Sequence, residues 1–188
     1  MPLRSNLFCT VQDTDATLDN FLSTNSWINK KRSIDQWKNW ANKGASSKAV
    51  VNHPDLFTAD GRNGPLTYEV ELYQGCVRFK RGCKFCIEPK KGIPIWREEH
   101  DIIDEVNLAI ENGVQNIRLG GATDVYTYKA EGVLDLEYPI PNPEPISDLL
   151  FGLRENENLQ ILHVDNGNPS IIAENIGPSS EITKAMID

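Results

Sequence analysis

The stretch that decides the fold runs from Gly75 to Cys86 and reads GCVRFKRGCKFC. It holds three of the four cysteines of the chain, spaced C-x6-C-x2-C. Three clustered thiols without a fourth indicate a metal centre with one coordination position left open. An open position on a metal is typical of a reactive site rather than of a structural one. The stretch follows residues 68–73, which have the composition and alternation of a β-strand.

The whole chain has the composition of a globular protein. Its 188 residues are 39% hydrophobic and 24% charged, which suits one domain with a real core and argues against general disorder. A net charge of −8 disfavours a surface that coats nucleic acid, although a local basic patch stays possible. No apolar run reaches bilayer length, and the first residues contain no signal-peptide core. Three crowded cysteines then favour a reduced, cytoplasmic protein with a metal site.

Hydrophobic periodicity divides the chain into two parts. Residues 1–66 are predicted to form a helical N-terminal segment and a linker, with a helix over 33–49 opened by a capping box of Ser33 and Gln36. Residues 67–188 alternate strand and helix. Strands are predicted at 68–73, 116–119 and 159–164, and helices at 98–112, 143–154 and from Ser179 or Ser180 onward. This order predicts an α/β fold with a parallel sheet and right-handed crossovers.

Residues with chemical potential follow the end of each predicted strand. The cysteine stretch follows the first strand, Gly120 and Gly121 follow the second, and Asp165 and Asn166 follow the third. In parallel α/β folds, ligands bind at the carboxyl ends of the strands. We therefore expect these three segments to lie around one site. Asp165 and Asn166 also fit a simple turn before a helix.

Several centres can be built from these cysteines. A structural zinc needs a fourth ligand, for which the candidates are His100, His53 and Cys9. A disulfide with one thiol left over does not suit a reducing compartment. An iron–sulfur cluster on three thiolates accounts for the odd number directly.

The loop around the cysteines is basic in an otherwise acidic chain. Its positive residues would offset an anionic cluster, favour an anionic substrate, or form a solvated basic loop; they are Arg78, Lys80, Arg81 and Lys84. Phe85, directly before the last cysteine, is expected to shield one flank of a cluster.

Four stretches resemble the radical S-adenosylmethionine (SAM) superfamily, and in particular its largely archaeal, uncharacterised Fe–S oxidoreductases. The features that carry the resemblance are an aromatic residue before the final cysteine and a double glycine after the second strand. The stretches are residues 40–45 (WANKGA), 73–86 (YQGCVRFKRGCKFC), 118–121 (RLGG) and 162–169 (LHVDNGNP). The resemblance extends over roughly residues 33–188.

The resemblance implies a [4Fe–4S] cluster on Cys76, Cys83 and Cys86, with SAM on the open iron. Cleavage of SAM would then give a 5′-deoxyadenosyl radical that abstracts hydrogen from an unknown substrate, after reduction by an electron donor such as ferredoxin or flavodoxin. Gly120 and Gly121 match the glycine pair that faces the methionine part of SAM. Asp124 is a candidate for the acidic residue that follows this pair in many members, and Asp165 and Asn166 could face the same pocket.

The chain departs from the superfamily pattern in spacing and in length. The first cysteine gap is six residues where three is usual, so the loop before Cys83 must bulge. About three βα units are predicted where a full barrel has six. Residues 67–188 are thus expected to form the N-terminal half of a radical SAM barrel, with weak or no turnover alone. The alternative is a zinc-binding or nucleic-acid-interaction module that uses the cysteines structurally.

Overall fold

The structure is a computed structural model that describes residues 33–47, 67–120 and 124–187. The chain divides into two units, Met1–Gly44 and Ala45–Asp188, and each is described by itself. Helix α3, Ile34–Ala45, supplies the described part of the first unit. Its predicted capping box is confirmed, because Ser33 N donates to Gln36 Oε1 (3.1 Å) and Gln36 N donates to Ser33 Oγ (3.2 Å).

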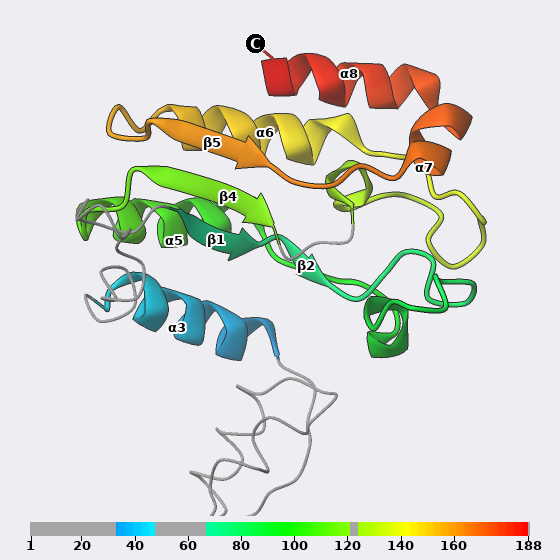
Figure 1. Cartoon of the computed structure of the whole chain (residues 1–188), viewed down its shortest axis with the longest axis horizontal. Helices are drawn as coiled ribbons and strands as arrows, with labels where there is room; N and C mark the ends of the chain where they lie inside the picture. The colour runs from blue at the N-terminus through cyan, green and yellow to red at the C-terminus, as the bar shows by residue number, and fades with distance from the viewer. Residues whose placement is uncertain (1–32, 48–66, 121–123, 188) are drawn as a thin grey trace, which may run out of the picture. The chain divides into compact units, whose positions relative to one another are not determined.

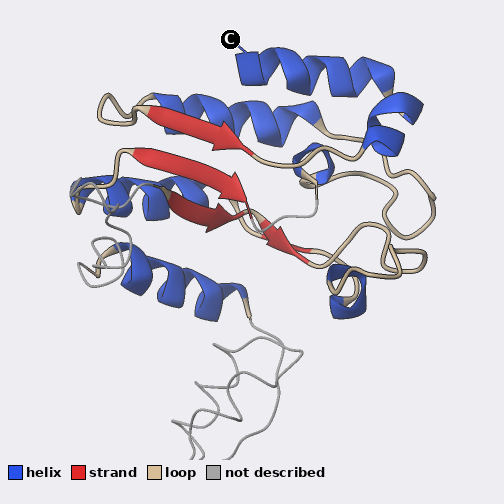
Figure 2. Cartoon of the chain, in the orientation of Figure 1, coloured by secondary structure: helices blue, strands red, loops and turns tan. Residues whose placement is uncertain are grey.

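The second unit is built on a parallel sheet of three strands, as the sequence predicts. The strands are β1 (Tyr68–Glu71), β4 (Asn116–Gly120) and β5 (Ile161–Val164), in the order β1-β4-β5. All three arrows point the same way in Figure 2, and the loops gather beyond their tips. The α/β class with a parallel sheet is therefore confirmed. The three strands do not close into a barrel within the described residues.

Helices cover one face of this sheet. Figure 1 shows α5 (Glu99–Glu111) and α6 (Pro143–Arg154) behind the strands, and α8 (Ile176–Ile187) packs against α6. The predicted apolar stripe of α6 is fully buried, and it consists of Ile146, Leu149, Leu150 and Leu153. These side chains meet the buried strand residues Val70, Ile117 and Leu119 in one core. No described helix of this unit covers the opposite face (Figure 1).

Two predicted elements differ from the structure. The strand predicted at 68–73 is divided, since β1 ends at Glu71 and β2 (Tyr73–Gln74) turns away to pair antiparallel with β3 (Ile95–Trp96). The last helix, predicted to begin at Ser179 or Ser180, begins earlier: α8 starts at Ile176, and a further short helix, α7 (Pro169–Glu174), precedes it. Pro169 fits the first turn of α7, where a missing N–H costs nothing. No described helix is long and apolar enough to cross a membrane.

Candidate metal centre and cofactor site

The three clustered cysteines lie in one long loop between β2 and β3. The two ends of this loop are joined by a hydrogen bond, which Cys76 N donates to Gly92 O (3.3 Å). Gly75 has a φ of +92°, and a Cβ atom there would lie 2.8 Å from Gly92 O. Only glycine allows the two arms to approach this closely. The antiparallel β2–β3 pair thus provides a firm base for the loop, and sequence reasoning missed it because each strand has only two residues.

The three thiols are available as ligands. Cys83 is exposed, Cys76 and Cys86 are half-buried, and none of them forms a disulfide. The amide of Arg78 donates to Cys76 Sγ (3.3 Å), a type of contact that stabilises a thiolate sulfur in iron–sulfur loops. Across residues 33–47, 67–120 and 124–187, no three His, Cys, Asp or Glu side chains lie close enough to hold a metal ion. The donor chemistry fits an iron–sulfur cluster, and the ligand assignment stays a prediction.

A zinc site would need a fourth ligand from elsewhere in the chain. The His100 side chain is 71% exposed on α5, and its Nε2 lies 3.2 Å from Asp101 Oδ1. The other two candidates, His53 and Cys9, fall outside the described residues. The described part of the chain therefore contains no assembled four-ligand zinc site.

The basic residues of the cysteine loop contact a second loop, residues 131–140. Lys80 Nζ donates to Leu134 O (2.7 Å), Arg81 pairs with Glu137 (3.0 Å), and the Arg78 guanidinium lies 5.8 Å from the centre of the Tyr138 ring. Three of the four basic side chains of the loop therefore interact with groups of the same unit. Lys84 is exposed.

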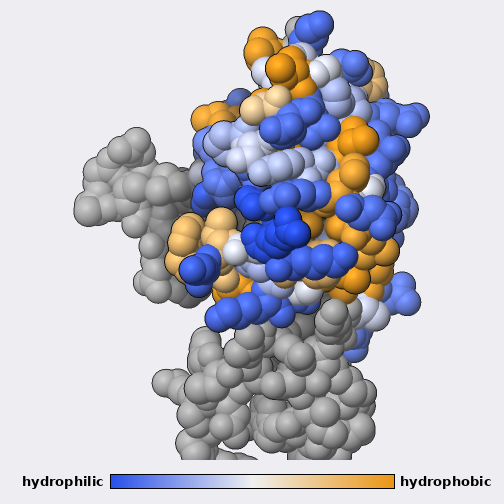
Figure 3. Space-filling view, turned by 90° about the vertical axis from the view of Figure 1, so that its right-hand side faces the viewer, coloured by the Kyte–Doolittle hydropathy of each residue, from blue (hydrophilic) through white to orange (hydrophobic). Residues whose placement is uncertain are grey.

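Hydrophobic groups are also exposed at this end of the molecule. Phe85 is 93% exposed, and its role beside a cluster stays a prediction. Figure 3, which views this end, shows a mainly hydrophilic surface with hydrophobic groups beside it.

Gly120 and Asp124 lie next to the start of the cysteine loop. Gly120 is the last residue of β4 and is paired in register with Glu71, whereas Gly121 lies outside the described residues. Tyr73 at the start of β2 donates its hydroxyl to Asp124 O (2.8 Å). The predicted convergence of the first two strand ends is therefore present in the structure.

Asp124 is a buried carboxyl with an altered acidity. It is only 2% exposed, and its Oδ1 accepts a hydrogen bond from Tyr126 N (3.0 Å). Burial raises the pKa of Asp124 to about 6, although the nearby backbone amides of Asn168 and Tyr126 act in the opposite direction. Its Oδ2 makes no hydrogen bond within the described part of the chain. A buried oxygen without a donor suits a ligand that brings one, such as an ammonium group.

Asp165 and Asn166 have different roles at the end of β5. Asp165 accepts a hydrogen bond from Arg118, and its amide donates to Leu119 O (3.1 Å). Asn166 has a φ of +56°, and its carbonyl accepts a hydrogen bond from Val125 N (3.2 Å). Asn166 thus serves the turn, as the structural interpretation of this stretch predicts. Asp165 presents its side chain toward β4.

A buried charge network fixes the chain where the cysteine loop returns to the domain. Arg97 is 2% exposed, and its Nη1 lies 2.6 Å from Glu105 Oε2 and 2.9 Å from Glu71 O. Tyr68 donates to the other Glu105 oxygen (3.0 Å). Burial first, and the charge of Glu105 second, raise the pKa of Tyr68, so its hydroxyl stays a donor. No sequence signal marked Arg97 as buried.

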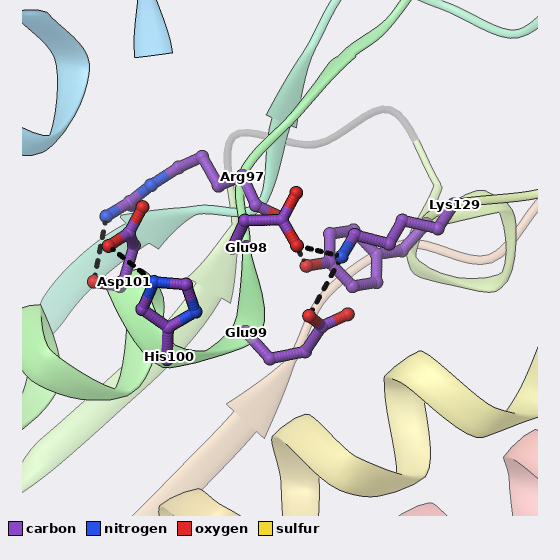
Figure 4. A network of polar contacts seen from close by, with 7 residues as sticks. Arg97, Glu98, Glu99, His100, Asp101 and Lys129 are labelled. Atoms are coloured by element: carbon purple, nitrogen blue, oxygen red, sulfur yellow. Dashed lines mark hydrogen bonds and ion pairs between the residues drawn. The ribbon is translucent and has the colours of Figure 1, made fainter. Parts of the chain in front are cut away.

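The network continues at the surface of α5. Figure 4 shows Lys129 reaching both Glu98 (2.7 Å) and Glu99 (2.8 Å), and Arg97 reaching the Asp101 carbonyl (3.3 Å). Tyr128, next to Lys129, donates its hydroxyl to Arg97 O. The helix after the cysteine loop is thereby tied to the segment after β4.

Comparison with known proteins places these features in context. No protein-family profile matches the chain. The chain is 35% identical over 182 residues to an uncharacterised protein of Methanocaldococcus jannaschii, covering 93% of this chain and 32% of the relative. An uncharacterised protein of Archaeoglobus fulgidus is 34% identical over 152 residues, 79% of this chain and 25% of its own length.

Characterised relatives match as well. A tRNA-2-methylthio-N(6)-dimethylallyladenosine synthase of Geobacter sulfurreducens is 32% identical over 133 residues, 69% of this chain and 27% of the synthase. The chain is therefore homologous to uncharacterised archaeal proteins and to radical SAM tRNA methylthiotransferases. It spans a third or less of the length of these curated relatives.

Proposed function

We propose that the chain forms part of a radical SAM enzyme. In this proposal Cys76, Cys83 and Cys86 hold a [4Fe–4S] cluster, whose open iron accepts SAM. The observation that carries the proposal is the position of the cysteine loop. It starts from the same edge of a parallel sheet at which Gly120, Asp124 and Asp165 lie. Homology to radical SAM methylthiotransferases supports it over part of their length.

The residues of the sheet edge would bind and orient SAM. Gly120 and Gly121 would allow a close approach to the backbone. Asp124 would accept a hydrogen bond from the SAM amino group at its buried Oδ2. Asp165 and the turn at Asn166 would close the pocket from the third strand. When bound and reduced, the cluster and SAM supply a 5′-deoxyadenosyl radical that abstracts a hydrogen atom from the substrate.

The loop itself would set the electrostatics of the cluster. The Arg78 amide at Cys76 Sγ would stabilise the thiolate form of that ligand. The side chains of Lys80 and Arg81 contact the 131–140 loop, so the loop that carries the cysteines is fixed to a second segment of the unit. An external reductant such as ferredoxin or flavodoxin would deliver the electron.

Anaerobic reconstitution with iron and sulfide tests the proposal. We expect about four irons and four sulfides per chain and a reduced cluster whose electron paramagnetic resonance spectrum changes when SAM is added. Binding rather than turnover is the readout. A colourless protein that takes up one zinc per chain would contradict the proposal.

Two cysteine variants distinguish a predicted cluster ligand from a cysteine that is not predicted to bind the cluster. Cys83→Ala should lose most of the bound iron, since three thiolates are needed for the cluster. Cys9→Ala is the matched control, because it removes a thiol outside the C-x6-C-x2-C stretch and should keep the cluster. A Cys83→Ala protein with full iron content would refute the ligand assignment.

A further inference from the structure

The sheet face that the helices leave uncovered carries a row of charged side chains. The register sets Glu69 of β1 opposite Arg118 of β4, and Arg118 opposite His163 of β5. Their side chains are 50%, 41% and 58% exposed, whereas Val70 and Leu119 next to them in sequence are buried. Strand alternation therefore points the row away from the core.

Arg118 joins the row to the end of β5. Its Nη1 donates to Glu69 Oε2 (3.1 Å), and its Nη2 donates to Asp165 Oδ2. Asp165 Oδ1 in turn lies 3.7 Å from His163 Nε2. Each carboxylate uses a different nitrogen of one guanidinium. A lysine, which has a single ammonium group, could not reproduce this fork.

The two carboxylates that Arg118 holds lie beside Gly120. A Cβ atom on Gly120 would come within 2.7 Å of Glu69 Oε1, so the flexible end of the Glu69 side chain lies beside this glycine. Asp165 is bonded through its amide to Leu119 O, the residue before Gly120. Glu69 of β1 therefore lies beside the glycine, and Asp165, which follows β5, is bonded to β4 on its other side.

Stability alone does not explain this arrangement. Arg118 and Glu69 are both largely exposed, and ion pairs that are open to solvent contribute little to the free energy of folding. Counted together with Asp165, the row carries one more negative than positive charge when His163 is neutral. Such a surface receives a cationic or hydrogen-bond-donating group and repels an anion.

We propose that Arg118 is a positioning residue of the candidate site, which holds Asp165 and Glu69 on the two sides of Gly120 so that they accept a cationic group of the bound ligand. The inference rests on the proposed function, in which Gly120 and Asp165 contact SAM. Arg118 acts through the two carboxylates and touches no ligand itself.

Hydrogen exchange of the chain without SAM gives the first test. In Arg118→Gln, the backbone amides of residues 165–167 should exchange about fivefold faster, while the melting temperature stays close to that of the wild type. Arg118→Lys should show an intermediate rate, and it replaces Arg118→Gln if the glutamine variant fails to fold. Arg154→Gln, which loses bonds to the carbonyls of Ala185 and Met186, is the control and should leave these amides unchanged. Unchanged exchange in Arg118→Gln overturns the inference.

SAM affinity of the reconstituted protein gives the second test. Arg118→Gln and Asp165→Asn should each weaken binding about tenfold, the usual effect of losing a residue that orients a ligand-binding group. The double variant should bind no more weakly than Asp165→Asn alone, and Arg118→Lys should recover part of the loss. Additive losses in the double variant would contradict the inference. If the wild type binds no SAM, the proposed function fails, and the exchange rates still decide the role of Arg118.

Discussion

Replacing Arg97 by methionine tests whether the buried charge network holds the base of the cysteine loop. The change keeps an unbranched side chain but removes the charge that faces Glu105 at 2.6 Å, with both side chains almost fully buried. Glu105 then keeps the Tyr68 hydroxyl and loses its arginine. Leaving a buried charge without its partner costs about 3–5 kcal/mol.

Urea unfolding followed by circular dichroism measures this loss. A loss of that size is a large fraction of the stability of a typical domain, so the midpoint should fall steeply without a change in slope. Arg81→Met is the matched control, because its partner Glu137 is also acidic but the arginine side chain is 71% exposed. The control should lose less than about 1 kcal/mol.

A double variant separates the lost charge pair from lost packing. In Arg97→Met with Glu105→Leu, both charges disappear, and the total loss should be much smaller than the sum of the single losses. Equal losses in Arg97→Met and Arg81→Met, or strict additivity in the double variant, would refute the reasoning.

Three further predictions concern the loop base, the buried carboxyl and the core. Gly75→Ala should lose about 1–3 kcal/mol in urea unfolding and bind less iron, because it combines a positive φ with a contact to Gly92 O. Gly113→Ala is the control, because Gly113 has a φ of +103° but no atom near its would-be Cβ, so this variant should show the backbone strain alone. Equal losses in the two variants would show that the contact with Gly92 O does not matter. The pKa of Asp124 is raised to about 6 from an ordinary value of 3.8, so the stability that this carboxyl contributes is present below pH 4 and lost between about pH 4 and 6. Between about pH 4 and 6, the free energy of unfolding of the wild type should fall by about 3 kcal/mol more than that of Asp124→Asn. Parallel pH–stability curves for the two proteins would exclude the effect. Leu149→Ala on α6 should cost about 2–5 kcal/mol in thermal or urea unfolding. Phe151→Ala, two residues further and 69% exposed, should be nearly neutral, and a similar cost at both positions would show that burial is not the cause.

The regular elements of the fold could be predicted from the sequence because their signals are local and repeated. The stripe of Ile146, Leu149, Leu150 and Leu153 has helical spacing, and α6 has the predicted bounds. The third strand was predicted from residue 159 and begins at Ile161. On α6 the hydrophobic pattern coincides with the face that the tertiary structure buries.

The parts that could not be predicted depend on contacts between distant residues. β2 and β3 are two residues each and are held by pairing across the cysteine loop, which leaves no periodic signal. Arg97 and Glu105 are charged residues that sequence patterns assign to the surface, and only their mutual contact makes burial possible. The alternation of Glu69 and Arg118 with buried neighbours could have predicted a charged sheet face, and it was the one available signal for this part of the site.

The candidate site residues also fall into those whose position could be predicted and those whose environment could not. The meeting of the cysteine loop, Gly120 and Asp165 at one sheet edge follows from parallel topology, which sequence order already implies. The burial of Asp124 does not, because it depends on Tyr73 from another strand. The sequence could therefore indicate where the candidate site lies, whereas the raised pKa of Asp124 follows only from its burial in the packed structure.

The charged row on the uncovered face also bears on how the strands find their pairing. A slip of β4 by one residue would turn Arg118 into the core and Ile117 and Leu119 out to solvent. It would also separate Arg118 from both Glu69 and Asp165. A misaligned sheet would thus lose apolar burial and ion pairing together. Correct alignment of β4 during folding would in turn decide whether Gly120 arrives opposite Glu71, beside the base of the cysteine loop.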